Sequence, residues 1–189
     1  ADGVDAAHVQ REAAAPTGVA MVMVDDAAQN RIVLAPGANA RLAPAAIDAA
    51  RDLIAGAAMV ALQLETPVET VLRAAQAARA AGRRVLLNPA PAPTQPLPDA
   101  LWPLVDDLIP NESEAAALTG VAVVDEASAR TAARLLRGRG VGRALITLGA
   151  RGVWFSGPEG ERLLPAAAVV ARDTTAAGDT FIGGYAAGL

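Results

Sequence analysis

The chain has 189 residues, of which 53% are hydrophobic and 19% are charged, a composition typical of a folded globular protein with a sizeable core. Its net charge of −4 argues against a general nucleic-acid binder, and no apolar run is long enough to span a membrane, so we expect a cytoplasmic protein with no nucleic-acid or membrane partner. The sequence has no cysteine, no lysine and one histidine, which excludes zinc clusters, cysteine–histidine catalysis and a Walker-type phosphate loop. Carboxylate chemistry supported by backbone amides remains.

The first half of the chain begins with two short apolar runs at 17–24 and 31–35. A polar turn separates them, and together they predict a β-hairpin. Apolar residues at helical spacing follow at 44–54 and 68–81 and predict two helices. Between these helices the run MVALQLE (59–65) predicts a buried strand.

The second half of the chain alternates the same two patterns. Apolar runs predict further strands at 83–88, 105–109, 143–148, 151–156 and 161–165. Helical patterns predict helices at 112–118, at 126–137 and from about residue 176. Strands that alternate with helices of this length indicate right-handed β–α–β units, and therefore a single α/β domain over 1–189 with a mostly parallel sheet.

Polar residues follow several of the predicted strands at the point where each strand ends. Ligands of open α/β sheets bind at the carboxyl ends of the strands, so these positions form the candidate site. They are Glu65, Asn88, Asn111 with Glu114, Thr147 with Gly149, and the segment 173–179. We expect them to lie along one edge of the sheet.

The segment DTTAAGD (173–179) places a carboxylate, Asp179, in the first turn of an apolar helix. A helix N-terminus offers unpaired N–H groups and a partial positive charge, and residues 176–178 are too small to keep an anion from those amides. Asp179 would then lie beside a bound phosphate and could take a proton from a hydroxyl group. Ordinary capping by Thr174 or Thr175, with Asp179 stabilised by the helix dipole, is the alternative interpretation.

The motif NESE (111–114) also opens a predicted helix, and we expect Glu114 at its solvent-facing start. Asn111 and Glu114 are three residues apart and share a helix face, where they could hold the hydration shell of a magnesium ion. The alternative interpretation is a capping box, with Asn111 as the N-cap and Glu114 at N3.

Two further candidate positions have both a functional and a structural interpretation. The glycines of TLGARG (147–152) would let a nucleotide lie close to the backbone, and they also suit a tight turn between two strands. Glu65 could bind sugar hydroxyls, or it could simply end its strand in solvent.

The motif DTTAAGDTF (173–181) resembles the signature of the ribokinase-like carbohydrate kinases. Five further stretches resemble the same family in the same order and with similar spacing: TGVAMVMVDDAAQNRIVLAPGAN, ALQLETPVETV, LLNPAPA, PNESEAAALTG and ITLGARGV. Within the family, GAN, LQLE and NPAPA favour the ribokinases over relatives that act on fructose or adenosine. The resemblance implies a Rossmann-like three-layer sandwich and a small β lid to which residues 17–40 contribute.

The resemblance also implies a role for each candidate residue. Asp179 becomes the general base that activates the sugar's primary hydroxyl, and Ala176, Ala177 and Gly178 become the anion hole for the phosphoryl group. The resemblance implies sugar contacts from Glu65, Ala20 and Ile32. It implies contacts to Mg-ATP from Asn111, Glu114 (to magnesium through water), Thr147, Gly149, Ala150, Arg151 and Gly152. It implies a site for a monovalent cation, typically potassium, formed by Asp173 and the Thr175 carbonyl.

The activity implied by the resemblance is ATP-dependent phosphorylation of D-ribose to D-ribose 5-phosphate, with Mg²⁺ and K⁺, in a homodimer paired through the β lid. The family's N-terminal and C-terminal segments are missing from the sequence, so we expect a central fragment. Two alternatives stay open. One is a kinase of the same family for another sugar or a nucleoside, and the other is a truncated, non-catalytic relative that binds nucleotide or sugar.

Overall fold

The computed structural model describes residues 3–24, 30–169, 174 and 176–188. Its main body is a six-stranded sheet in which each strand lies beside the next strand of the chain. The strands are β3 (Met59–Leu62), β4 (Arg84–Leu87), β5 (Asp107–Leu108), β6 (Arg143–Thr147), β7 (Val153–Gly157) and β8 (Gly160–Leu164). Strands β3 to β6 run parallel, and β7 and β8 pair antiparallel. The predicted α/β fold with a mostly parallel sheet is confirmed.

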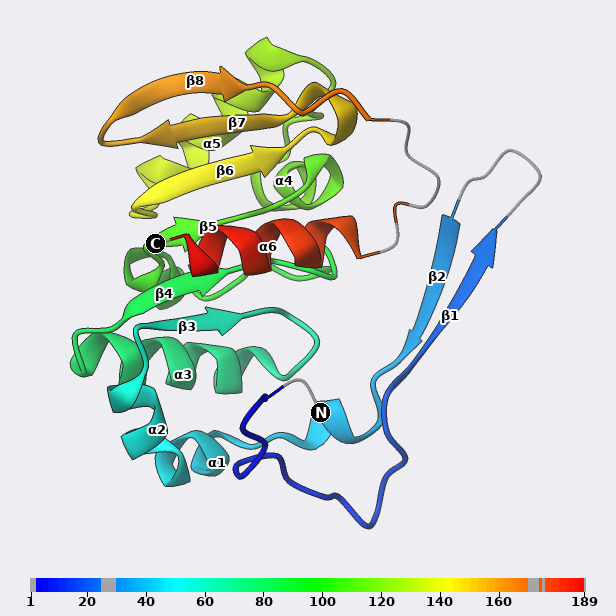
Figure 1. Ribbon diagram of the computed structural model, residues 1–189, viewed down its shortest axis with the longest axis vertical. Helices are drawn as coiled ribbons and strands as arrows, with labels where there is room; N and C mark the ends of the chain where they lie inside the picture. Colours follow the sequence, from blue (N-terminus) through cyan, green and yellow to red (C-terminus); the bar gives the residue numbers. More distant parts are fainter. Residues whose placement is uncertain (1–2, 25–29, 170–173, 175, 189) are drawn as a thin grey trace.

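Helices cover both faces of this sheet, with α6 crossing one face and α3 and α5 lying on the other (Figure 1). The helices are α1 (Pro44–Ala49), α2 (Arg51–Gly56), α3 (Val68–Ala80), α4 (Glu112–Thr119), α5 (Glu126–Gly138) and α6 (Ala177–Ala187). Three short 3-10 helices are η1 (Gly37–Arg41), η2 (Asp99–Leu104) and η3 (Gly149–Arg151). In the described part of the chain, none of the helices is long and apolar enough to cross a membrane.

Alternate residues of the strands supply two separate hydrophobic cores. In β4, Val85 and Leu87 are fully buried in a core with the small apolar residues of α3, α4 and α5. Leu86 lies between them in sequence and packs in the other core, against Phe181 and Ile182 of α6. Successive strand side chains point to opposite faces of a sheet, so a strand that is apolar at every position needs a helix layer on each side. The predicted three-layer sandwich is therefore present.

A second, two-stranded sheet is the antiparallel hairpin of β1 (Val19–Val24) and β2 (Asn30–Ala35), as predicted. It stands apart from the six-stranded sheet in Figure 1. Val19, Met21 and Met23 of β1 are exposed although they are large and apolar. The hairpin thus leaves an uncovered apolar face.

Two element boundaries differ from those predicted from the sequence. The helix expected over 44–54 is interrupted at Ala50, where ψ is 15°, and forms α1 and α2 instead. The strand expected over 59–65 ends at Leu62, because the chain then bends so that the Leu64 N–H donates to the Ala90 backbone oxygen. Glu65 therefore lies in a bend beyond the strand rather than at its last position.

Candidate active site

The carboxyl ends of β4, β5 and β6 are joined by hydrogen bonds from the residues that follow them. The side-chain N–H of Asn88, after β4, donates to the Ile109 backbone oxygen at 2.8 Å. The Thr147 N–H, at the end of β6, donates to the Pro110 backbone oxygen at 2.9 Å, and Thr147 forms an isolated parallel bridge with Asn111. Asn88, Asn111 and Thr147, selected from the sequence, therefore lie side by side along one edge.

Asn111 and Glu114 hold one another at the start of α4. Asn111 Oδ1 accepts from the Glu114 backbone N–H at 2.9 Å, while the Glu114 carboxylate accepts from the backbone and side-chain N–H groups of Asn111 at 2.8 and 2.9 Å. This is the capping box considered as the alternative. The expectation of a solvent-facing Glu114 is wrong, because the residue is only 6% exposed. Burial raises its pKa, against the lowering effect of the Asn111 backbone N–H.

The glycine-rich loop after β6 is a closed turn. The Leu148 N–H donates to the Gly152 backbone oxygen at 2.8 Å, and the Gly152 N–H donates to that of Gly149 at 3.0 Å. Gly152 has a φ of +101°, and a Cβ there would lie 2.0 Å from the Leu164 backbone oxygen. Only glycine lets the loop lie this close to the end of β8. The tight turn between strands is therefore present, and Gly149 and Ala150 within it are exposed.

This loop and the start of α6 line a single cavity of about 370 Å³. It is bounded by Thr147, Gly149, Gly152, Val153, Leu164, Pro165, Ala166, Ala177, Gly178 and Phe181. The volume is within the range of small-molecule sites. The structure thus brings the glycine loop (147–152) together with Ala177 and Gly178 of the later DTTAAGD motif (173–179).

The start of α6 has an unusual backbone at Ala176. This N-cap residue has a φ of 57°, the left-handed region, and is the one non-glycine residue with positive φ in the described ranges. Left-handed non-glycine residues cost free energy and gather at functional sites. The N-cap is Ala176 and not Thr174, and its methyl side chain makes no capping hydrogen bond. Thr175, the other capping candidate, lies outside the described residues. The Ala177 N–H instead donates to the Thr174 backbone oxygen at 3.2 Å.

Two residues of this first turn leave its outer side open. Asp179 is an exposed carboxylate at the third helical position. A Cβ built on Gly178 would meet no atom within 4 Å. The backbone here is accessible to a ligand, as the small residues predicted.

The base of the hairpin and the bend after β3 line another cavity, of about 320 Å³. Its walls are Gly18, Val19, Ala20, Leu34, Ala35, Pro36, Asn39, Leu64, Glu65 and Pro91. Ala20 and Glu65, two of the three implied sugar contacts, therefore share one cavity. Ile32, the third, lies in β2 opposite Val22, and its side chain is outside the described part of the structure.

Other implied contacts are placed differently or lie outside the description. The Arg151 side chain donates to the Val124 backbone oxygen at 2.7 Å and to Glu112 at 3.0 Å, so it ties η3 to α4 and the loop before α5. Ala150 is exposed in η3. Asp173 and Thr175, implied for the monovalent cation, are outside the described residues. Within those residues, no three acidic, histidine or cysteine side chains gather as a metal site would require.

Sequence reasoning did not single out two residues that line these cavities. Asn39 belongs to the GAN motif, which indicates the family but by itself assigns no contact to this side chain. Phe181 lies four residues after Ala177 and so shares its helix face, a spacing that could have identified it.

The comparison with known families covers the full chain. Residues 1–189 match the family model of the pfkB family carbohydrate kinases. The chain belongs to this family. Among pfkB-family proteins, the ribokinase of Haemophilus influenzae is 44% identical over 188 residues, which is 100% of this chain and 61% of that protein. The deoxyribokinase of Salmonella typhimurium is 36% identical over 184 residues, 97% of this chain and 60% of that protein.

A solved pfkB-family structure shows the same fold. The Arabidopsis thaliana ribokinase complexed with ribose and ATP matches with a TM-score of 0.77 at 30% identity, over 91% of this chain and 56% of that one. The chain thus spans about three fifths of the length of the relatives it matches.

Proposed function

We propose that the protein transfers the γ-phosphoryl group of ATP to the 5-hydroxyl of D-ribose, with Asp179 as general base. The observation that carries this proposal is the cavity shared by the glycine loop and the N-terminus of α6. A nucleotide lying along the loop would direct its phosphates at the amides of α6, where the helix dipole favours negative charge. Family membership and the ribokinase relatives support the same activity.

The residues of this cavity fit ATP. Gly149 and Gly152 bring the backbone to the ligand without side chains, and Gly178 leaves the first turn of α6 uncovered. Phe181 and Val153 supply apolar surface for the nucleotide's uncharged part. Bound ATP supplies the phosphoryl group, and the protein's part is to position and stabilise it.

The proposed cation contacts come from two segments of the chain. Asn111 is bridged to Thr147, so the Asn111–Glu114 pair starts α4 next to the nucleotide loop. Each Glu114 oxygen accepts one hydrogen bond from Asn111 and keeps a second lone pair for a magnesium-bound water. Asp173 and the Thr175 carbonyl would hold potassium beside the anion hole. Both cations would offset phosphate charge.

The proton of the sugar hydroxyl would go to Asp179. Its carboxylate is exposed beside the helix N-terminus, so it can reach a hydroxyl that approaches the phosphate. The backbone of residues 176–178 would stabilise the transferred group. The Ala177 N–H donates to the Thr174 backbone oxygen at 3.2 Å. This hydrogen bond is long, so a phosphate oxygen can compete for the same N–H group.

The cavity under the hairpin is the proposed sugar site. Glu65 offers a carboxylate to the sugar hydroxyls, and Ala20 and Leu34 of the hairpin form an apolar cover. A cover of this kind excludes water from the reacting groups.

A second substrate is supported by a specific comparison. The Salmonella typhimurium relative is a deoxyribokinase at 36% identity, so a sugar with one hydroxyl fewer is the first alternative. A nucleoside kinase and a non-catalytic binder are further alternatives.

A coupled ADP-release assay on the complete protein tests these possibilities. It would compare D-ribose, deoxyribose, fructose and adenosine at fixed Mg-ATP, with and without potassium. The proposal expects the highest kcat/KM with ribose and activation by potassium. If another substrate gives a higher kcat/KM, that substrate takes the place of ribose in the proposal. If the protein binds nucleotide but releases no ADP with any of the substrates, the catalytic proposal is overturned.

A further inference from the structure

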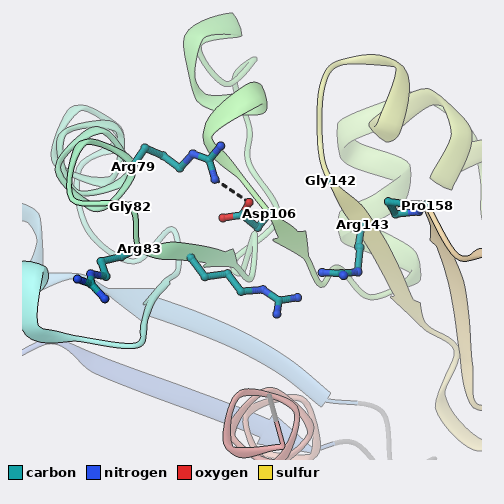
Figure 2. A pocket seen from close by; sticks show the side chains of 8 residues that line it. Arg79, Gly82, Arg83, Asp106, Gly142, Arg143 and Pro158 are labelled. Carbon is teal, nitrogen blue, oxygen red and sulfur yellow. Dashed lines mark hydrogen bonds and ion pairs between the residues drawn. The ribbon is translucent and has the colours of Figure 1, made fainter.

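A cavity of about 400 Å³ opens at the other end of β4, β5 and β6, where these strands begin (Figure 2). It is lined by Arg79 at the end of α3, Gly82, Arg83, Arg84, Asp106, Gly142, Arg143 and Pro158. Four of these eight residues are arginines and one is acidic. Such a concentration of guanidinium groups in one hollow calls for a chemical explanation, because like charges repel.

Arg79 lines the cavity and uses little of its hydrogen-bonding capacity within the described part of the protein. Figure 2 shows its side chain reaching across to Asp106, whose Oδ1 lies 2.8 Å from the Arg79 guanidinium. The second oxygen of Asp106 accepts the Val85 N–H, also at 2.8 Å. Asp106 therefore has a partner at each oxygen, while Arg79 uses one of its five N–H groups in this ion pair.

Arg84 and Arg143 are held close together by Asp107, which is completely buried. Arg84 makes a bidentate pair with its carboxylate, at 2.6 and 3.0 Å, and Arg143 lies 3.5 Å from the same group. Arg143 also pairs with Glu159 at 2.8 Å. Both arginine side chains remain more than a quarter exposed. Each keeps N–H groups with no protein acceptor among the described residues.

Arg83 adds a fourth cation at the rim of the cavity. In Figure 2 its side chain points away from Asp106 and Arg143. Its Nε is buried and has no hydrogen-bond partner in the part of the chain that the structure describes. Its charge adds to the potential in the cavity, although its side chain does not point to the centre.

The charge balance favours a small anion. The guanidinium groups of Arg79, Arg84 and Arg143 are balanced by three carboxylates, Asp106, Asp107 and Glu159, and Arg83 at the rim supplies the one positive charge in excess. The chain as a whole carries −4, which disfavours a long polyanion such as nucleic acid. Guanidinium groups bind phosphate oxygens with paired, charge-assisted hydrogen bonds.

We propose that this cavity binds a small dianionic oxyanion, inorganic phosphate or a phosphate ester. The site is separate from the candidate active site, since the same three strands begin at this cavity and carry Asn88, Asn111 and Thr147 at their other ends. A ligand here therefore does not compete with nucleotide. The inference does not depend on the proposed kinase activity.

Glycine amides offer a readout at each site. In the complete protein labelled with ¹⁵N-glycine, Gly82 and Gly142 report on this cavity, and Gly149 and Gly178 report on the nucleotide cavity. Inorganic phosphate and glycerol phosphate would be titrated separately, with and without saturating ATP analogue. We expect the amide resonances of Gly82 and Gly142 to shift saturably with the anion, and to do so equally when the ATP analogue is bound. The anion with the lower Kd, inorganic phosphate or glycerol phosphate, identifies the ligand as free phosphate or as an ester.

Two arginine variants make the test decisive. Arg79→Gln should weaken the anion affinity at least tenfold, and Arg79→Lys should retain part of it. Arg51→Gln, which changes an exposed arginine with a long 3.9 Å ion pair on α2, is the matched control and should change the affinity less than twofold. If Arg79→Gln alters the spectrum of the free protein, Arg143→Lys replaces it, because this change keeps the charge beside Asp107 and Glu159 but removes the forked guanidinium group. Shifts confined to Gly149 and Gly178, or an unchanged affinity in the cavity variants, would overturn the proposal.

Discussion

The hydroxyl of Tyr185 donates a 2.8 Å hydrogen bond to the carboxylate of Asp107, 78 residues earlier in the chain. Asp107 lies at the centre of the sheet in β5 and is fully buried, and Tyr185 lies on α6, the helix that begins with the candidate catalytic turn. The same carboxylate holds Arg84 and Arg143. One buried acid therefore fixes α6 against the sheet with a polar contact, in a layer otherwise held by apolar packing.

This contact predicts an unusual titration of Tyr185. Burial, followed by the hydrogen bond to Asp107, raises its pKa to about 12, above an ordinary value of about 10. The folded state thus holds the phenol proton more strongly than the unfolded state does. The resulting stabilisation is complete below about pH 10 and is lost as the pH rises through about 12. The absorbance difference at 295 nm between the complete protein and its Tyr185→Phe variant should inflect near pH 12, and an inflection near 10 would contradict the contact.

The Gly178→Ala variant tests whether glycine is needed at this position for the fold or for phosphate binding. A Cβ at Gly178 meets no atom of the described structure within 4 Å, and alanine favours a helix over glycine by about 1 kcal/mol. We therefore expect an unchanged or higher melting temperature together with a large loss of phosphoryl transfer, because the methyl group occupies the proposed anion site. Gly138→Ala, on an equally open position of α5, is the control and should leave turnover unchanged. Full activity of Gly178→Ala would exclude a phosphate at this turn.

Asp179→Asn tests the proposed general base. The amide keeps the shape of the side chain but cannot accept the hydroxyl proton, so kcat should fall by about 10²–10⁴. Nucleotide affinity should change little, since the backbone of residues 176–178 is retained. If Asp179 were only a first-turn charge, the change would cost at most about 1 kcal/mol of stability and leave turnover near normal. Measurements of kcat, nucleotide Kd and melting temperature on this one variant decide between the two roles.

Glu114→Gln should affect both stability and magnesium dependence. The carboxylate accepts two N–H groups of Asn111, and a glutamine offers only one oxygen to them, so we expect a loss on the order of 1 kcal/mol. Burial raises the pKa of Glu114, so the charged form is disfavoured in the folded state. This group therefore adds stability below its ordinary pKa of about 4.5, and that stability is lost as the pH rises through the folded value.

The proposed role of Glu114 in magnesium binding is tested separately from its role in the capping box. The proposed water-mediated contact predicts that Glu114→Gln needs more magnesium for half-maximal activity. Unfolding curves at several pH values and a magnesium titration of kcat should therefore both change. An unaltered magnesium requirement with reduced stability would leave Glu114 as a cap alone.

The hairpin predicts a homodimer of the complete protein. Val19 and Met21 of β1 and Val33 of β2 are exposed, and Met21 is paired with Val33 across the two strands. Exposed apolar clusters of this kind mark contact surfaces. Met21→Glu should convert the dimer to a monomer in sedimentation at micromolar concentration, whereas Val124→Glu, at an exposed apolar position away from the hairpin, should not. A wild-type protein that sediments as a monomer would exclude this pairing.

The sheet and the site edge were predictable because short-range patterns encode them. Apolar runs such as RVLL in β4 and the capping spacing of Asn111 and Glu114 depend on neighbouring residues alone. The break at Ala50 was not predictable, since neither glycine nor proline interrupts the helical spacing there. The burial of Asp107 was also missed, because it depends on Arg84, Arg143 and Tyr185, which only the folded chain brings together.

The candidate site was predictable in outline for the same reason. Residues at strand ends share an edge in any parallel sheet, so the grouping of Asn88, Asn111 and Thr147 follows from topology. The left-handed backbone of Ala176 could not be predicted in this way, because alanine ordinarily avoids that region and no local motif in the sequence specifies it. The burial of Glu114 likewise depends on how α4 packs against the sheet.

The strand order has a consequence for how the chain acquires its structure. Within the described residues, each strand from β4 to β8 pairs with the strand that precedes it in the chain. Each parallel pairing therefore closes one crossover at a time, and the entropy cost of closing a crossover rises only slowly with its length. On the ribosome, β3 and β4 can pair before β5 has emerged, and every later strand adds to an existing edge.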